Sequence, residues 1–245
     1  MQSTLARLGL LSRHLKSVIM FKPNITVYTA DTPNGQKVTL ALEELGIPYN
    51  LKKLSFAKNE QKEDWFLKIN PNGRIPAIVD HSRNDFPVFE SGAILLYLVQ
   101  HYDPNYRLWP TDIDQQSEVV QWVMFQMGGV GPMQGQANHF SRFAPEKIPY
   151  GINRYQSETK RLYQVLDGRL QGREYLVGDH LTIADIINFP WVLSHNFSGV
   201  SLDDLPNLQA WVERIRSRAT IEKAFGSEAL ERLRVVDAEA KTGSA

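Results

Sequence analysis

Thr32-Pro33-Asn34-Gly35 is the first stretch of the chain whose residue types could support chemistry. It follows a β-branched and aromatic run, Ile25–Thr29, and precedes an apolar helical stripe, so it connects a predicted strand to a predicted helix. The Thr32 hydroxyl, the Asn34 amide and the backbone amides of the helix N-terminus are hydrogen-bond donors that suit a thiolate. A thiol titrates near ~8.5, and donors that lower its pKa by about 2 units stabilise the thiolate by ~2.7 kcal/mol. The same residue types are also typical of a simple turn and helix cap.

The sequence contains no cysteine. The protein therefore has no disulfide, no thiolate metal ligand and no thiol nucleophile of its own. Its six histidines show no metal-ligand spacing, so no metal site is predicted. Any sulfur chemistry must use a thiol that arrives with a ligand.

Pro76 opens an apolar strand in the stretch Asn70–Ala77. A proline has no amide to donate to a strand ladder. If the Ile75–Pro76 bond is cis, the backbone of Ile75 faces outward, where an extended peptide can pair with it. An edge-strand proline without a ligand is the alternative interpretation.

Glu90 and Ser91 lie between a predicted strand and a predicted helix. At the helix start, the free amides and the macrodipole near Ser91 favour an anion. The Glu90 carboxylate beside it can receive an ammonium group. An α-amino acid carries both charges on one carbon, so the pair suits an amino-acid head group. Alternatively, Ser91 is only an N-cap.

The elements that must position these residues alternate between strand and helix from Asn24 to Asp103. Apolar periodicity and turn residues predict the order βαβ, then α, then ββα. This part is expected to form a mixed sheet domain over residues 21–103. The predicted strands are 25–29, 49–54, 75–79 and 87–89, and the predicted helices centre on 38–45, 65–69 and 94–102.

The second part, residues 112–235, is predicted to be entirely helical. Helical patterns cover Gln115–Met127, the long stretch from Tyr155 to Leu170 and a last strong helix at Leu208–Ile215. Thr182 and Asp185 have the spacing of a capping box, which fixes the start of a buried helix. The small, polar tail 238–245 is expected to be disordered. The fold class is α/β plus all-α.

Gly128, Gly129 and Gly131 interrupt a helical run. Three glycines within a helix cost a few kcal/mol of helix propensity, so a close approach is expected there. The approaching group could belong to a second substrate or to a two-fold partner.

The bulk composition excludes several classes of protein. The 245 residues carry 27 basic and 27 acidic side chains, which gives no net field for nucleic acid or an anionic membrane. No apolar run approaches the roughly 18 residues that span a bilayer. Residues 1–20 are basic, amphipathic and free of acids, which is typical of a mitochondrial transit peptide; a disordered N-terminus is the alternative. The expected location is the cytoplasm, or the mitochondrion if this leader is used.

Taken together and in this order, the motifs resemble those of the glutathione transferases over about residues 24–224. The resemblance is greatest to the fungal nitrogen-regulator-like class and its bacterial Nu-class relatives. It implies an N-terminal thioredoxin-like βαβαββα domain, a C-terminal helical bundle and a homodimer. The matching runs are Thr32–Gly35, Asn70–Pro76, Glu90–Leu95, Gly128–Met133, Arg154–Gln156 and Thr182–Asp185.

The resemblance implies that glutathione is the co-substrate and assigns its contacts. A cis Pro76 lets Ile75 pair with the cysteinyl backbone, and Glu90 and Ser91 take the γ-glutamyl head. Gln61 is expected near the tripeptide.

The resemblance also implies that Asn34 lies near the sulfur with Thr32 beside it, as catalytic residues. Arg154 is expected to reach glutathione or a second glutathione molecule, from its own or the partner subunit. Tyr28 is interpreted as core or pocket wall rather than as a catalytic tyrosine.

The thiolate is then held by hydrogen bonds alone, which leaves two reactions open. One is conjugation to a small-molecule electrophile, and the other is glutathione-dependent disulfide reduction. A non-catalytic regulatory module that binds a protein partner is the alternative function.

Overall fold

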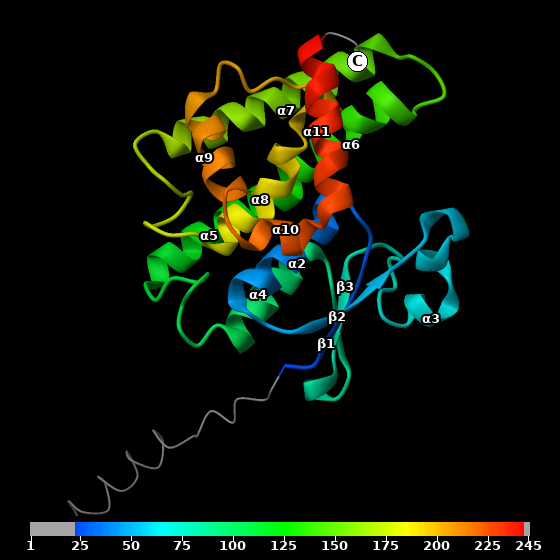
Figure 1. Ribbon diagram of the computed structural model, residues 1–245, viewed down its shortest axis with the longest axis vertical. Helices are drawn as coiled ribbons and strands as arrows, with labels where there is room; N and C mark the ends of the chain where they lie inside the picture. The colour runs from blue at the N-terminus through cyan, green and yellow to red at the C-terminus, as the bar shows by residue number, and fades with distance from the viewer. Residues whose placement is uncertain (1–22, 243–245) are drawn as a thin grey trace, which may run out of the picture.

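The computed structural model describes residues 23–242. The predicted leader, residues 1–20, lies outside the described residues. Figure 1 shows a small sheet domain beside a larger helical domain, as the sequence predicts. Within residues 23–242, no helix is long and apolar enough to cross a membrane.

The sheet domain contains four strands in the order β2-β1-β3-β4. β1 pairs with β2 in parallel and with β3 antiparallel, and β4 pairs antiparallel with β3. The predicted thioredoxin-like order is confirmed. Its elements are β1 (Ile25–Thr29), α2 (Pro33–Leu45), β2 (Tyr49–Lys53), the short helices Phe56–Lys58 and Glu60–Lys62, α3 (Asp64–Leu67), β3 (Ala77–Asp80), the short helix His81–Arg83, β4 (Phe86–Phe89) and α4 (Ser91–Tyr102).

Alternation along β1 separates the two faces of the sheet. Val27 faces α2 and α4 and belongs to the main core, which continues into the helical domain as far as Trp211. Tyr28 faces the opposite side and packs with Phe66 of α3 in a smaller cluster. Tyr28 is therefore a core residue, one of the two roles predicted for it.

The helical domain packs onto the sheet domain through α2, which contacts both α8 and α10. No strand follows β4 in the part of the chain that the structure describes. The elements are α5 (Ile113–Phe125), the π-helical turn η4 (Gln126–Val130), α6 (Gly131–Asn138), the π-helical turn η5 (His139–Phe143), α7 (Pro149–Leu170), α8 (Ile183–Leu193), the short helix η6 (His195–Ser198), α9 (Pro206–Arg216), α10 (Thr220–Phe225) and α11 (Ser227–Thr242).

The sequence misjudges several boundaries, and two of the differences have a physical explanation. β3 begins at Ala77 rather than Ile75, because Pro76 has no amide for the ladder. α11 continues to Thr242, so the expectation of disorder is wrong for residues 238–242. Polar contacts to other elements hold this helix in place, among them Asn196 Nδ2 to Asp237 Oδ1 at 2.8 Å. Leu230 and Leu233 of the same helix also pack against the main core, and their i, i+3 spacing is a sequence signal for this helix.

Candidate functional site

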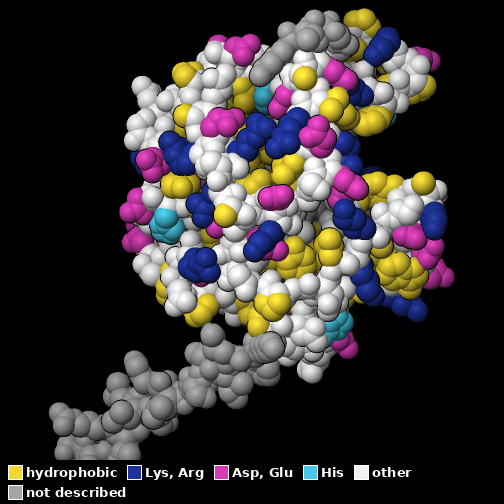
Figure 2. Space-filling view, in the orientation of Figure 1, with side chains coloured by type: hydrophobic (Ala, Val, Ile, Leu, Met, Phe, Trp, Pro, Cys, Tyr) yellow, Lys and Arg dark blue, Asp and Glu magenta, His cyan; other side chains and the backbone are white. Residues whose placement is uncertain are grey.

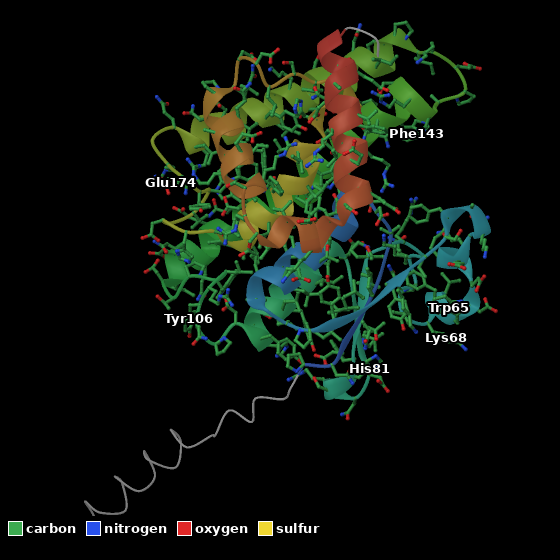
Figure 3. All side chains as sticks on the ribbon, in the orientation of Figure 1. Trp65, Lys68, His81, Tyr106, Phe143 and Glu174 are labelled. Atoms are coloured by element: carbon green, nitrogen blue, oxygen red, sulfur yellow. The ribbon has the colours of Figure 1, made fainter. Side chains whose placement is uncertain are left out.

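A cavity of about 1370 Å³ lies between the sheet domain and the helical domain. Figure 2 shows it as a notch in the right edge of the molecule. Phe143, labelled in Figure 3, lies on its upper rim, across the opening from α3. Seven of the predicted site residues line it: Thr32, Asn34, Gln61, Ile75, Pro76, Glu90 and Ser91.

The floor of the cavity includes the N-terminus of α2. Thr32 is the N-cap, and its hydroxyl oxygen accepts a hydrogen bond from the Gly35 amide at 3.2 Å. The hydroxyl proton therefore remains available for a ligand, together with the first amides of the helix. Gly35 lets the helix begin close to β1, because a Cβ there would lie 2.1 Å from Thr29 Oγ1 and 2.4 Å from the Ala30 carbonyl oxygen.

The orientation of Asn34 is fixed from the helical domain. Trp191 of α8 donates from Nε1 to Asn34 Oδ1 at 2.9 Å. An indole nitrogen is a donor only, so it selects the amide oxygen and leaves Nδ2 as the branch that a ligand can use. Asn34 can therefore offer a donor to a thiolate. Sequence analysis missed Trp191 because α8 is buried along its whole length, where a tryptophan is indistinguishable from core.

We expect Trp191→Phe to lower turnover with glutathione about tenfold, because losing this neutral hydrogen bond releases the Asn34 amide. Glutathione affinity should stay within about twofold, since the contact is not with the ligand. Steady-state kinetics and calorimetry measure the two effects. Trp122→Phe, which alters a partly buried tryptophan outside the cavity lining, is the control. An unchanged kcat in the Trp191 variant would contradict the orienting role.

The strand edge at Ile75 has the predicted geometry. The Ile75–Pro76 peptide bond is cis. The β3 ladder begins at Ala77, so Ile75 lies beyond it and lines the cavity. The buried Asn70 shapes the loop before it: its Nδ2 donates to the Arg74 carbonyl at 2.6 Å, and its Oδ1 accepts from the Asn72 amide at 3.0 Å.

Gln61 brings an unpaired acceptor to the same wall. Its Oε1 is buried and has no hydrogen-bond partner among the described residues. A buried polar atom without a partner is costly, so this oxygen suits a donor on a ligand.

Glu90 and Ser91 form the far end of the cavity, at the start of α4. Glu90 adopts φ +69°, a left-handed conformation that is unfavourable for a non-glycine residue and is often retained at binding sites. Ser91 is buried beneath it, and its Oγ accepts from Lys37 Nζ at 3.2 Å. Sequence analysis missed Lys37, because a lysine in a helix is normally exposed.

Arg154 is the one predicted site residue that the cavity does not include. It lies exposed on α7, where its charge lowers the pKa of Glu158 in addition to the larger effect of Arg161. The cavity of one chain is thus lined without it.

The predicted close approach at the glycines is made by the chain itself. A Cβ at Gly129 would lie 3.4 Å from Leu162 of α7, and one at Gly131 would lie 2.8 Å from Gln126 Nε2. Only Gly131 therefore has an internal packing reason, because the distance at Gly129 is an ordinary van der Waals contact and nothing lies within 4 Å of a Cβ at Gly128. Gly135, one turn later, lines the cavity, and a Cβ there would lie 3.5 Å from the Trp191 ring.

The α11 helix forms a wall of the cavity that sequence analysis did not find. It contributes Leu233, Val235 and Val236 to the lining. Its Arg232 bonds to Asp31 Oδ2 at 3.2 Å, and Lys53 reaches the same carboxylate at 2.8 Å. Burial opposes ionisation of Asp31, but these two cations keep its pKa below the usual value. The wall that α11 gives to the cavity is thus partly apolar and partly charged.

No group of three or more His, Asp or Glu side chains in residues 23–242 could hold a metal ion. The donors at α2, the edge at Ile75 and the pair Glu90 and Ser91 at the start of α4 instead fit an extended, amino-acid-derived thiol. Two family models match the chain. The model of the glutathione S-transferase N-terminal domain matches residues 23–100, and the model of the C-terminal domain matches residues 153–219. The chain belongs to the glutathione S-transferase family.

Its relatives are of the Ure2-like type. The chain is 45% identical over 205 residues to the disulfide-bond oxidoreductase YfcG of Escherichia coli, covering 82% of this chain and 94% of that protein. The structure of Ure2p in complex with glutathione has a TM-score of 0.78 and 36% identity, covering 82% of this chain and 97% of that one. The glutathione transferase URE2P6 of Phanerochaete chrysosporium, in complex with oxidized glutathione, has a TM-score of 0.78 and 39% identity, with coverages of 86% and 97%. The predicted family and fold are confirmed, and the chain is a glutathione-dependent enzyme.

Proposed function

We propose that this enzyme reduces disulfides with glutathione and that conjugation of electrophiles is its secondary reaction. The observation that carries the proposal is a site with thiolate-stabilising donors in a chain that has no cysteine. Both sulfur atoms of the exchange then come from glutathione and its substrate. The similarity to YfcG, and at 35% identity to the disulfide-bond oxidoreductase YghU of Escherichia coli, supports this choice.

The proposed orientation of glutathione uses all the predicted wall residues. Its cysteinyl backbone pairs with Ile75, and its glutamyl ammonium and carboxylate lie at Glu90 and Ser91. Its sulfur then lies at the α2 N-terminus, where Thr32 and Asn34 donate to the thiolate. Gln61 accepts from the tripeptide backbone.

The reaction proceeds in two exchanges. The bound glutathione thiolate attacks one sulfur of the substrate disulfide, forming a mixed disulfide and releasing a substrate thiolate that takes up a proton. A second glutathione thiolate attacks the glutathione sulfur of that mixed disulfide. The second substrate thiolate leaves and takes up a proton, and oxidised glutathione forms.

The size of the cavity supports this reaction. Its volume of about 1370 Å³ exceeds the ~300–1000 Å³ that is usual for a pocket with one small ligand. A glutathione transferase structure from Burkholderia graminis, 39% identical with a TM-score of 0.78, holds two glutathione molecules per subunit and covers 91% of this chain and 95% of that one.

Turnover with bis-hydroxyethyl disulfide and with chlorodinitrobenzene tests the proposal. We expect kcat/KM to be at least about tenfold higher with the disulfide, because hydrogen bonds alone hold the thiolate. Turnover with chlorodinitrobenzene only would make conjugation the main reaction. If neither substrate turns over and a protein partner binds regardless of glutathione, the regulatory alternative is correct.

We further propose a homodimer, which the family resemblance implies. Phe89 on β4 and Met124 on α5 are large apolar side chains with 38% and 55% exposure. They flank the point where α4 begins against α5, at Gly92 and Val123. Sedimentation should give twice the 27.9 kDa of one chain. Met124→Glu should lower the measured mass towards that of the monomer, whereas Ile113→Glu, at the exposed start of α5, should leave the mass unchanged.

A further inference from the structure

Lys37 is a lysine in α2 with only 1% of its surface exposed, directly behind the start of α4. Its Nζ donates to three neutral acceptors: Ser91 Oγ at 3.2 Å, Gln126 Oε1 at 2.6 Å and Met127 Sδ at 3.9 Å. None of the ion pairs within residues 23–242 includes it. Lysine is almost never fully buried without a paired anion, so this position lacks the ion-pair contact that its burial calls for.

The three acceptors suit an ammonium group, which has three donors and no lone pair. These neutral acceptors nevertheless solvate the ammonium group poorly, and burial lowers the pKa of Lys37 well below its ordinary value. Glu90, the N-cap residue of α4, is the charged neighbour that partly offsets this effect. The neighbouring α5–η4 segment contributes only the neutral Gln126 and Met127. Gln126 itself is fully buried, and its Nε2 has no partner among the described residues.

We propose that Lys37 is the buried countercharge for the glutamyl α-carboxylate of glutathione, acting through Ser91, and that binding of this carboxylate is coupled to uptake of a proton by Lys37. The inference rests on the orientation of glutathione given under Proposed function. It makes Lys37 a positioning residue, because Ser91 lies between it and the ligand.

The geometry supplies the coupling. Ser91 Oγ accepts from Lys37, and its own proton, which points to Met127 Sδ at 3.4 Å, is a better donor to a carboxylate than to sulfur. A carboxylate oxygen at the ordinary ~2.7 Å from Ser91 Oγ lies within about 6 Å of Lys37 Nζ. An opposite charge at that separation favours the ammonium form.

The sign of the pH dependence follows. The ligand carboxylate raises the pKa of Lys37. Affinity for the ligand is therefore greatest at pH values below the pKa that Lys37 has in the unbound protein. Affinity falls as the pH rises from the Lys37 pKa of the unbound protein to the Lys37 pKa of the complex, by up to about tenfold per pH unit. S-methylglutathione is the appropriate probe, because its sulfur does not titrate.

Calorimetry of S-methylglutathione in buffers of different ionisation enthalpy tests the coupling. The native chain should take up protons on binding. Lys37→Met, which keeps the length of the side chain, should abolish the uptake and weaken binding about 10- to 100-fold. Lys68→Met is the control, since Lys68 is exposed at the end of α3 and lies outside the cavity lining (Figure 3).

Two ligand analogues separate a countercharge from a purely structural role. An S-methyl analogue without the α-carboxylate should bind the native chain and Lys37→Met equally. One without the α-amine should retain the dependence on Lys37. Two results would overturn the inference. One is that Lys37→Met loses affinity equally for all three ligands. The other is that the native chain binds S-methylglutathione without proton uptake.

If Lys37→Met does not fold, proton uptake by the native chain with the two analogues still decides the question, because uptake should vanish only without the α-carboxylate. Failure of the native chain to bind S-methylglutathione at all is a different result. It contradicts the proposed function.

Discussion

Asn34→Ala is expected to reduce turnover with glutathione about 100-fold, because it removes a preorganised donor from the sulfur site. In the native chain Trp191 fixes the Asn34 amide through a 2.9 Å hydrogen bond, so the donor needs no reorganisation when the thiolate forms. Thr32 and the helix amides remain, which is why some activity should persist. Glutathione affinity should change less than about threefold, since the main contacts lie at Ile75, Glu90 and Ser91.

The thiolate itself gives an independent measurement of the Asn34 effect. The chain has no cysteine, so the ultraviolet absorbance of thiolate in the complex comes from glutathione and not from a protein thiol. Its apparent thiol pKa should be higher in Asn34→Ala than in the native complex. Asn50→Ala, an exposed change on β2, should leave the titration unaltered. The thiol of glutathione could instead titrate in the Asn34→Ala complex as it does in the native complex, while glutathione binds weakly. That result would mean that Asn34 binds the tripeptide rather than stabilising the sulfur.

The sequence could predict the parts of the site that depend on local backbone geometry. Thr32 caps a helix, and Pro76 begins a strand that cannot use its amide. Glu90 and Ser91 begin another helix. Each is a contiguous motif with a local physical cause, and the structure brings all of them to one cavity.

The contacts that complete the site come from distant segments and have no local signature. Trp191 reaches Asn34 across 157 positions, and Lys37 reaches Gln126 across 89. The α11 wall is held by Arg232 and Asp31, 201 positions apart. Charged and polar partners of this kind have no period in the sequence, so only the fold identifies them.

The Thr182–Asp185 capping box combines contacts within a local motif with contacts to distant segments. The sequence predicts the local contacts, and the structure contains them: Asp185 Oδ2 accepts from the Thr182 amide at 3.0 Å, and the Thr182 hydroxyl accepts from the Ala184 amide at 3.2 Å. The other carboxylate oxygen has two distant partners that the sequence could not indicate. It accepts from the Leu176 amide and from Trp211 Nε1, both at 2.9 Å.

Asp185→Ala should therefore lower the free energy of unfolding by about 3–5 kcal/mol, far more than the ~1 kcal/mol of an ordinary cap. Asp185 is fully buried, and this burial raises its pKa above the usual value although the hydrogen bonds act in the opposite direction. Alanine leaves four buried donors without this acceptor, namely the amide and hydroxyl of Thr182, the Leu176 amide and Trp211 Nε1, and each unsatisfied donor costs about 1–3 kcal/mol.

Urea denaturation of Asp185→Ala, Asp185→Asn and Asp179→Ala measures this effect. Asparagine keeps one oxygen acceptor and should lose less than alanine, while the exposed Asp179 should have an effect within about 0.5 kcal/mol. A loss below about 1 kcal/mol in Asp185→Ala would show that water replaces the carboxylate. Because α8 also carries Trp191, a destabilised helix start should reduce activity at temperatures where the protein is still folded. The buried cap and the sulfur site are then connected through a single helix.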